Sequence, residues 1–513
     1  MLISLDTLRA DHLSAYGYER ETSPFLARLA ERATVFERVL APYPATLVSH
    51  MSLFTGLYPQ QHGVYPPNGV LAAEVPTLPE RFRAAGFRTA GFTEGGFVAG
   101  GYGFARGFET FADPPYQADT DLEATLNRGL DFLRGLGPEE RFFLFLHSYA
   151  IHDPYAPPAE FAGRFAPTDP GNAALSKGED LRDFNRGRRD FDAPTVEDFA
   201  RLYDGTILYA DQALENFFGE LERLGLAAET TVLVTSDHGE EFLEHRRLGH
   251  TQLYPESLFV PLFLVAPDQS VGVRLPTLAR LVDLAPTLYD LAGIEAAAGL
   301  AGASLVPCLR DPASCPDAEA YAEVADEERN RTLIVREDGH LYQFHLVVYD
   351  SDPDGTWISR RAVFDLAGEA LTFRGRSFHR PRTVRVSVDG AAPTELAVGV
   401  EWADYLVPLG GGASRHRLTL EADGCDVPAE VEEGDDERCL SLLVQGPTLT
   451  RSELFDLTLD PLATRDLSRT EPALHRRLAR RLAALEWEPV GGARTTEISA
   501  QQEEMLRALG YVD

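Results

Sequence analysis

Short, continuous runs of apolar residues, each ended by a polar residue, are the feature that most constrains the fold of this 513-residue chain. Four such runs are Leu2–Leu5, Thr89–Thr93, Phe142–Leu146 and Thr231–Thr235. Amphipathic helical patterns lie between them, for example at Ser23–Phe36 and Ala200–Leu224. Uninterrupted apolar strands that alternate with helices are typical of a parallel sheet covered on both faces. We therefore predict an α/β fold with a central, mostly parallel sheet and helices on both sides.

Polar side chains follow three of these runs, at the point where each strand is predicted to end. Asp6 follows the first run, His147 the third, and the pair Asp237-His238 the fourth. In open α/β sheets, ligands bind beyond the carboxyl ends of the strands. An isolated Asp-His pair is more often structural, but several strand ends with ligand-type side chains together predict a metal or anion site.

The stretch Pro42–Val64 carries the strongest candidate for a nucleophile. A Pro-rich approach ends at Thr46, Ser49–Thr55 is predicted to form two helical turns, and Gly56 stands where a helix commonly stops. The Thr46 hydroxyl is thereby placed beside a helix N-terminus, where free N–H groups and the helix dipole attract anions. Two interpretations follow: Thr46 caps the helix, or it is a nucleophile that a base or a metal deprotonates.

One divalent cation can join these elements. Asp6, Thr46, Asp237 and His238 together offer oxygen and imidazole ligands for a single ion, which would lower the pKa of the Thr46 hydroxyl. Such ligands suit manganese, magnesium, calcium or zinc. We predict one divalent metal ion and leave its identity open.

Further histidines and one lysine are candidates for contact with substrate. His147 and His152 lie in FLFLHSYAIHDPYAPP, and His250 lies in EHRRLGHTQLYPESLFVPL. Singly, each is more often a hydrogen-bonded structural residue, but together they suit a bound oxyanion, and one could protonate a leaving alkoxide. Lys177, in a loop without clear pattern, is a further candidate, and His62 is predicted to hold its own turn.

The composition restricts the partners and leaves the compartment open. The net charge is −33 and the pI is near 4.8, which excludes nucleic acid because its phosphate backbone would be repelled. No apolar run approaches the length that spans a bilayer, so we predict no transmembrane segment. The chain begins inside a predicted strand, and we expect a periplasmic or secreted protein if a leader precedes Met1 and a cytoplasmic one otherwise.

From about Leu346 the sequence pattern changes from apolar strands that alternate with helices to short alternating stretches. Alternating stretches separated by Asp/Gly turns predict a small β-sheet or sandwich; they are Val384–Val388, Ala397–Glu401 and Arg415–Leu420. The acidic stretch Val427–Arg438 is predicted to be a solvated loop, and Pro472–Leu485 a basic helix. We predict an α/β catalytic domain at 1–345, a β-rich insert at 346–450, and a C-terminal subdomain at 451–513 that returns to the main fold.

The four cysteines allow two local disulfides. Cys308 with Cys315, and Cys425 with Cys439, would each close a short polar loop, and such bridges would indicate an oxidising compartment. Four free thiols fit the sequence equally well. No Cys/His spacing suggests a structural zinc site.

Taken in order, these segments resemble the sulfatase family of the alkaline-phosphatase superfamily. The matching segments are LISLDTLRADHLSAYGY, the Thr46 segment through GLYPQQHGV, HDPYAPP, TSDHGEEFLEH, GHTQLY, FVPLFLVAP, VDLAPTLYDLAGI, ELFDLTLDP and LRALGYVD. The resemblance covers nearly all of 1–310 and recurs at the C-terminus, but it does not cover the β-rich region. It implies an alkaline-phosphatase-like fold and a metal-dependent enzyme that hydrolyses sulfate or phosphate esters.

The nucleophile position departs from the usual family pattern. Active sulfatases carry Cys or Ser in a C/S-x-P-S-R motif and convert that residue to formylglycine. Thr46 stands at this position, and Val48 and His50 replace the Pro and the Arg. Oxidation of a threonine would give a ketone rather than an aldehyde. The tandem Asp after the first strand is likewise changed, to Asp6-Thr7.

Relatives with a threonine nucleophile on the same scaffold resemble the chain more closely here. Nucleotide pyrophosphatase/phosphodiesterases contain T-x-P-N-H-x-S-x-x-T-G, to which TLVSHMSLFTG is similar, including its histidine. Lipoteichoic-acid synthases and phosphoethanolamine transferases are also Thr-based. A second zinc would need a D-x-x-x-H pair, for which the 147–153 region has no convincing counterpart. The resemblance implies Asp6, Thr46, Asp237 and His238 as metal ligands, with His152 and His250 near the substrate. With the candidates above, we predict Thr46, His152 and His250 as catalytic residues and His50, His147 and Lys177 as substrate contacts.

Three functions fit the sequence. The first is a metal-dependent hydrolase or transferase of phosphate or sulfate esters with Thr46 as nucleophile, with phosphoesters favoured because phosphate chemistry suits threonine better. The second is a sulfuric ester hydrolase, the usual activity of the family. The third is a non-catalytic protein that binds a glycan or a lipid head group through the β-rich insert. In each case the partner is an anionic ester or head group.

Overall fold

The central sheet of the protein has eight strands, in the order β11-β2-β10-β7-β1-β6-β4-β5, and only β10 runs antiparallel to its neighbours. In this computed structural model the described residues are 1–114, 121–185, 187–267, 269–315, 318–325, 328–349, 356–358, 361–366, 370–408, 416–426, 440–445, 450–485, 487–492 and 494–495. The predicted α/β fold is confirmed. The strands are β1 (Leu2–Leu5), β2 (Thr34–Leu40), β4 (Arg88–Phe92), β5 (Thr110–Ala112), β6 (Phe142–Ser148), β7 (Val232–Thr235), β10 (Phe259–Val265) and β11 (Val273–Arg280).

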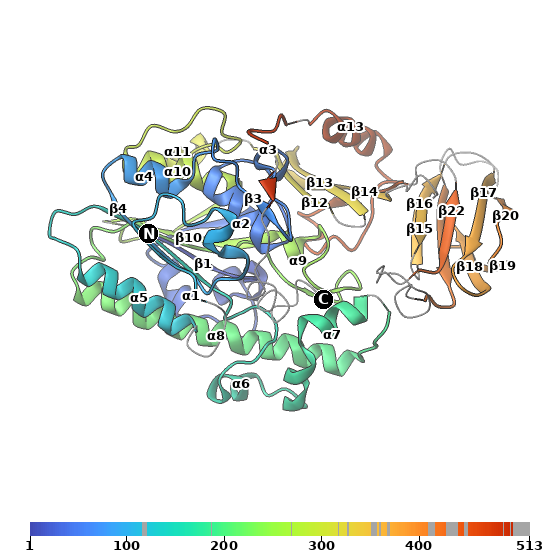
Figure 1. Ribbon diagram of the computed structural model, residues 1–513, viewed down its shortest axis with the longest axis horizontal. Helices are drawn as coiled ribbons and strands as arrows, with labels where there is room; N and C mark the ends of the chain where they lie inside the picture. Colours follow the sequence, from blue (N-terminus) through green and yellow to red (C-terminus); the bar gives the residue numbers. More distant parts are fainter. Residues whose placement is uncertain are drawn as a thin grey trace.

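Helices cover both faces of this sheet (Figure 1). In β1, Leu2 packs into the core on one face and Ile3 into the core on the other, as the alternation of a strand requires. The first core contains α2 (Thr46–Thr55), α4 (Leu78–Ala84), α10 (Leu284–Ala292) and α11 (Val306–Arg310). The second contains α1 (Pro24–Ala30), α5 (Leu122–Arg134), α7 (Gly178–Asn185) and α8 (Ala193–Arg223).

The helices predicted at Ser23–Phe36 and Ala200–Leu224 differ from the structure at their ends. The helix predicted at Ser23–Phe36 ends at Ala30, because the β-branched pair at Thr34 and Val35 begins strand β2, which pairs with both β10 and β11. Helix α8 contains most of the predicted Ala200–Leu224 helix but begins earlier, at Ala193, where the Asp192 side chain accepts a hydrogen bond from Thr195 N. At Thr34, strand pairing with β10 and β11 therefore replaced the predicted helix. At Ala193, the Asp192 cap starts α8 earlier than predicted.

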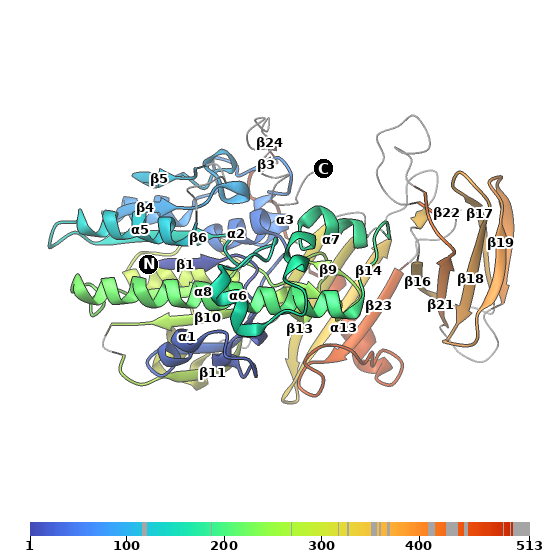
Figure 2. The same ribbon diagram turned by 90° about the horizontal axis from the view of Figure 1, so that it is seen from below.

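Beyond the central sheet the chain forms antiparallel sheets. A four-stranded sheet has the order β12-β13-β14-β23, and it begins before the predicted change of character at Leu346. Two more four-stranded sheets, β15-β22-β17-β20 and β16-β21-β18-β19, enclose a separate apolar core and form a sandwich set apart from the rest of the protein (Figure 2). The strands are β12 (Ala320–Ala325), β13 (Glu328–Glu337), β14 (His340–Tyr349), β15 (Thr356–Ile358), β16 (Arg361–Leu366), β17 (Ala370–Ser377), β18 (Arg382–Val388), β19 (Thr394–Val398), β20 (Ala403–Pro408), β21 (His416–Ala422), β22 (Leu442–Gln445) and β23 (Thr450–Asp456).

The predicted β-rich stretches agree with this sandwich, apart from the Ala397–Glu401 stretch, whose strand is β19 and ends at Val398. The predicted basic helix is α13 (Pro472–Ala483). The remaining short elements are α3 (Pro59–His62), α6 (Ala159–Phe165), α9 (Pro255–Leu258), β3 (Gly69–Val70), β8 (Glu241–Phe242), β9 (Leu248–Gly249), β24 (Arg494–Thr495) and the 3₁₀ turns η1 (Ala10–His12), η2 (Ser14–Tyr16), η3 (Gly96–Val98), η4 (Gly100–Tyr102), η5 (Pro170–Leu175), η6 (Leu281–Asp283) and η7 (Pro312–Ser314).

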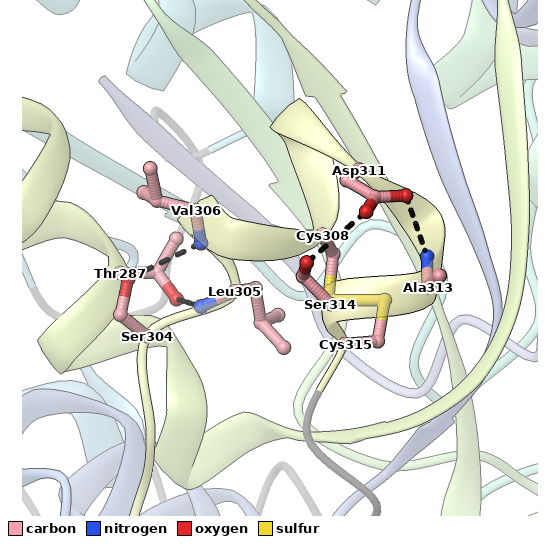
Figure 3. The surroundings of a disulfide bond; sticks show 9 residues. All are labelled: Thr287, Ser304, Leu305, Val306, Cys308, Asp311, Ala313, Ser314 and Cys315. Atoms are coloured by element: carbon pink, nitrogen blue, oxygen red, sulfur yellow. Dashed lines mark hydrogen bonds between the residues drawn. A yellow bond between two sulfur atoms is a disulfide. The ribbon is translucent and has the colours of Figure 1, made fainter.

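One predicted disulfide is present and joins Cys308 to Cys315 (Figure 3). The loop that it closes is held by the Asp311 side chain, which accepts hydrogen bonds from Ala313 N and Ser314 Oγ. Cys425 is also disulfide-bonded. Its predicted partner Cys439, the predicted acidic loop at 427–438 and the LRALGYVD segment at 506–513 lie outside the described residues.

No helix in the described part of the chain combines the length and the apolar character needed to cross a membrane.

Candidate active site

Three neighbouring strands bring their carboxyl ends to one edge of the central sheet. Strand β1 lies between β6 and β7, and Ser4 is paired with His147 on one side and with Thr235 on the other. Asp6 directly follows β1, and Asp237 comes two residues after β7 ends. Parallel strands in register therefore place the predicted ligands side by side.

Helix α2 places Thr46 against this edge. Thr46 is the first residue of the helix, three residues before the predicted start at Ser49, and Ala45 is the N-cap. The interpretation of Thr46 as a helix cap is therefore wrong. Gly56 ends α2 with a φ of 70°, and its N–H donates to Ser52 O. A side chain at Gly56 would meet Leu300 Cδ2 at 3.1 Å, so this end of the helix is tightly packed.

Thr46, Asp6, Asp237 and His238 form one buried group, which we name the carboxylate cluster. Thr46 Oγ1 lies 3.4 Å from His238 Nε2. The same nitrogen lies 3.3 Å from Asp237 Oδ2 and 3.8 Å from Asp6 Oδ1. All four side chains are completely buried. The four predicted metal ligands thus converge on one point.

The donor atoms of the carboxylate cluster fit a divalent cation. Asp6 Oδ1 and Asp237 Oδ2 are buried and make no hydrogen bond to any residue that the structure describes. His238 Nδ1 lies 3.0 Å from Gly239 O, and because a carbonyl only accepts, Nδ1 carries the hydrogen and Nε2 presents its lone pair to the cluster. A metal-binding histidine usually donates its other ring N–H to such a carbonyl, or to a carboxylate or water. One ligand atom from each of Asp6, Asp237 and His238 lies within 4.8 Å of the others.

The electrostatics of the two carboxylates also favour a cation. Burial, together with the nearby Asp237 carboxylate, raises the pKa of Asp6 to about 6. Burial opposes ionisation of Asp237 too, yet the His238 and His50 imidazoles hold the pKa of Asp237 below its usual range. Two buried carboxylates with oxygens within 4.8 Å of each other repel each other unless a positive charge lies between them.

The backbone around the cluster is locally constrained. Thr7 adopts a φ of 57°, which is uncommon for a residue that is not glycine, and its N–H lies 3.4 Å from Asp237 Oδ1. A side chain at Gly239 would meet Glu256 O at 1.9 Å, so only glycine fits directly after the Asp-His pair. Thr7 therefore stays in contact with the cluster through its backbone, although it lacks the carboxylate of the family pattern.

His152 and His250, which we name the histidine pair, lie beside the carboxylate cluster. Their ring centroids are 5.3 Å apart, and the His250 ring lies 4.5 Å from that of His238. Burial opposes the charge on His152, but the carboxylates of Asp153, Asp6 and Glu240 together outweigh it and raise the pKa of His152 to about 9. Burial and the neighbouring His152 lower the pKa of His250 to about 4. At neutral pH one imidazole is cationic and the other neutral, as a proton donor and acceptor need to be.

The three predicted substrate contacts lie in different places. His147 and His50 are completely buried against the carboxylates of Asp6 and Asp237, and their ring centroids are 4.7 Å apart. Lys177 is exposed in the residues just before α7. His62, predicted to hold its own turn, accepts a hydrogen bond from Val64 N at 3.1 Å and contacts Ser52 Oγ.

Three residues near the site were not predicted. Asp153 is one of the carboxylates that raise the pKa of His152, the Glu240 carboxylate lies 3.3 Å from His250 Nδ1, and Ser4 Oγ lies 2.9 Å from His50 Nε2. Each had a signal in the sequence: Asp153 adjoins His152, Glu240 follows the Asp-His-Gly turn, and Ser4 shares a strand face with Asp6.

The fold and the cluster define an α/β protein with a candidate metal site at the carboxyl ends of its strands. Residues 1–294 match the sequence profile of the family described as Sulfatase. The chain belongs to the sulfatase family.

Known proteins resemble this chain to different extents. It is 34% identical to arylsulfatase K of Xenopus laevis over 119 residues, which are 23% of this chain and 22% of that protein. The match therefore spans about a fifth of the relative. The solved structure of the phosphonate monoester hydrolase of Agrobacterium radiobacter has a TM-score of 0.61 and 16% identity and covers 94% of both chains. That of a 2-O GAG sulfatase has a TM-score of 0.59 and 17% identity and covers 94% of this chain and 89% of the other. At these identities the two structures establish a shared fold.

Proposed function

We propose that the protein is a metal-dependent ester hydrolase in which Thr46 attacks a phosphate or sulfate ester, with phosphoesters preferred. The observation that carries this proposal is the position of Thr46 Oγ1, at the first residue of α2 and 3.4 Å from His238 Nε2, within a buried group of carboxylates. A threonine cannot become formylglycine, so its own hydroxyl is the group available to attack.

Each residue of the site has a role in this reaction. Asp6, Thr46, Asp237 and His238 would hold one divalent ion, which lowers the pKa of the Thr46 hydroxyl and offsets charge on the ester oxygens. An ester next to Thr46 would lie at the N-terminus of α2, where the first-turn N–H groups and the dipole of a helix favour an anion. Both effects favour a tetrahedral anionic centre at the Thr46 hydroxyl.

The histidine pair completes the reaction. Thr46 loses its hydroxyl proton to solvent, and attack by the Thr46 alkoxide forms a covalent Thr ester as the bond to the leaving alkoxide breaks. His152, cationic at neutral pH, gives its proton to that alkoxide. Water then attacks the Thr ester, with neutral His250 as the base, and releases the inorganic anion; an acceptor hydroxyl in place of water would make the enzyme a transferase.

Turnover on three chromogenic substrates tests the proposal. Aryl sulfate, aryl phosphate and bis-aryl phosphate are supplied to wild type, Thr46→Ala and Thr46→Ser in the presence of Mn²⁺, Ca²⁺, Mg²⁺ or Zn²⁺. We expect phosphate-ester turnover that falls by at least about 10³-fold in Thr46→Ala and is partly retained in Thr46→Ser, because only serine keeps a hydroxyl. Full turnover by metal-loaded Thr46→Ala would show the mechanism to be wrong.

Sulfate-ester hydrolysis is the second candidate, and the family membership of residues 1–294 favours it. Sulfate turnover with no phosphate turnover in the same assay would replace the phosphoester preference. No turnover of any of the three esters would favour the third function, a non-catalytic protein that binds a glycan or a lipid head group. In that case the proposed binding insert is the region 346–450, between a catalytic domain at 1–345 and a C-terminal subdomain at 451–513. A glycan array would test that function.

A further inference from the structure

Two buried imidazoles contact the carboxylate cluster, one against each carboxylate. His147 comes from β6 and His50 from the second turn of α2. Both rings are completely buried, and they meet edge to face with centroids 4.7 Å apart. Their position differs from that of His152 and His250, which lie beside the cluster.

His147 contacts the Asp6 carboxylate oxygen that is not the one near His238. His147 Nε2 lies 3.1 Å from Asp6 Oδ2, and since an ionised carboxylate only accepts, this nitrogen carries the hydrogen. The bond engages Oδ2 and leaves Oδ1, the oxygen near His238 Nε2, without a hydrogen bond to any described residue. The neighbouring strand β6 thereby fixes which Asp6 oxygen faces the cation position.

His50 has partners at both of its ring nitrogens. Nδ1 lies 3.0 Å from Thr46 O and 3.3 Å from Asp237 Oδ2, and Nε2 lies 2.9 Å from Ser4 Oγ. The carbonyl of Thr46 only accepts, so Nδ1 carries the hydrogen, and Nε2 meets the Ser4 hydroxyl. His50 therefore joins the nucleophile's own backbone, one carboxylate of the cluster and strand β1.

A second metal ion is the other arrangement that this geometry allows. One ligand atom from each of Asp6, His50 and His147 lies within 4.8 Å of the others, a spacing that a cation also produces. The hydrogen-bond partners favour a single ion, with His147 and His50 as neighbours of its ligands and not as ligands themselves. His238 presents a lone pair to the cluster, whereas the nitrogens of His147 and His50 that face Asp6 and Asp237 carry hydrogens.

We propose that His147 and His50 are positioning residues that hold Asp6, and Asp237 with the Thr46 backbone, in the orientation that binds a single cation. The inference rests on the metal site of the proposed function. Outer partners of this kind change metal affinity by about 10- to 100-fold when they are removed. Neither imidazole contacts the substrate in this arrangement.

Mn²⁺ binding, measured without substrate by EPR, separates these possibilities. The test variants are His147→Leu and His50→Leu. The conservative partners are His147→Gln, whose amide replaces the Nε2 donor, and His50→Asn, whose amide replaces the Nδ1 donor. The matched control is His62→Leu, because His62 is equally buried and contacts a serine hydroxyl at 3.0 Å, in Ser52, but lies outside the carboxylate cluster.

We expect one Mn²⁺ per chain in wild type, a dissociation constant raised about 10- to 100-fold in both leucine variants, and recovery of most of the affinity in His147→Gln and His50→Asn. In His62→Leu the melting temperature should fall while the dissociation constant stays unchanged. Two coupled Mn²⁺ ions in wild type, with one lost in His147→Leu, would establish the second metal site and overturn the proposal. Unchanged affinity in all folded variants would overturn it as well. The proposed function fails on a separate result, the retention of turnover in Thr46→Ala.

Discussion

The carboxylate cluster and the histidine pair lie at the same edge of the sheet and use the same residue types in opposite ways. In the carboxylate cluster, His147 contacts Asp6 Oδ2 and leaves Oδ1 without a hydrogen bond to any described residue, and His50 Nδ1 lies 3.3 Å from Asp237 Oδ2, the oxygen that also faces His238. In the histidine pair, carboxylates set the charge of the imidazoles: Asp153 raises the pKa of His152. One group is built to hold a cation, the other to hold and move a proton.

The difference shows that residue type does not identify the role of a site residue. Both groups combine Asp or Glu with His, and their members are buried except His250, which is partly exposed. What separates them is the partner of each nitrogen: His238 Nε2 presents its lone pair to the Thr46 hydroxyl and faces two carboxylate oxygens, whereas His250 Nδ1 is turned towards Glu240. The predictions below test whether the two groups separate in function as they do in geometry.

Removal of the metal should have the largest effect. We expect chelation with EDTA, or the substitution Asp237→Asn, to lower turnover by about 10³-fold or more, because the nucleophile loses its activation and the ester loses its neutralising charge. Activity measured before and after addition of divalent ions, with metal content by mass spectrometry, checks this. Re-addition should restore wild type and not Asp237→Asn. Undiminished turnover after complete metal removal would contradict the role of the cluster.

Substitution within the histidine pair should reduce turnover and leave metal binding intact. We expect His152→Gln and His250→Gln each to lower kcat by about 10²- to 10⁴-fold, the usual contribution of a general acid or base. The loss should be smaller for an aryl ester, whose leaving group needs less protonation, than for an alkyl ester. Metal content equal to that of wild type is the control. A loss of metal in either variant would show that the two groups are one site.

The pH dependence of alkyl-ester turnover should report His152. Its pKa is raised to about 9, so the imidazole is protonated below that pH and loses its proton above it. We therefore expect kcat to fall about tenfold per pH unit above pH 9. In Asp153→Asn the fall should begin at lower pH, because the carboxylate that favours the cation is gone. A pH profile unchanged by Asp153→Asn would remove His152 from the role of acid.

Lys177→Ala should have the smallest effect. The side chain is exposed just before α7, whereas the carboxylate cluster is fully buried, so we expect kcat/KM on a small aryl ester to change by less than about twofold. Steady-state kinetics beside wild type checks this. A tenfold rise in KM would return Lys177 to the substrate contacts that the sequence predicted.

The sequence predicted the carboxylate cluster because its members occupy positions fixed by simple rules. Asp6 and Asp237 follow parallel strands, whose carboxyl ends meet at one edge, and Thr46 follows a Pro-rich approach to a helix. No comparable sequence rule predicts the direction in which a buried imidazole ring points. The contacts of His50 depend on Ser4, on another element, so the sequence left open whether its ring faces the substrate or the interior.

Misplaced element boundaries have a similar origin. The Ser23–Phe36 pattern fits a helix as well as it fits a helix followed by a strand, and only the pairing of β2 with β10 and β11 decides between them. Asp153 and Glu240 were missed because a carboxylate beside a histidine in sequence also occurs on solvated surfaces, and only burial gives these two their effect on the histidine pair.

The way in which the sandwich is attached has a consequence for the history of such chains. Strands β14 and β23 are hydrogen-bonded neighbours, with Val348 opposite Thr450, so the chain leaves and re-enters the sheet at positions about one strand spacing apart. A turn of two residues could bridge that distance. Residues 350–449 could therefore have been acquired, or could be excised, in a single genetic event that leaves the strand pairing and the carboxyl-end edge of the central sheet untouched.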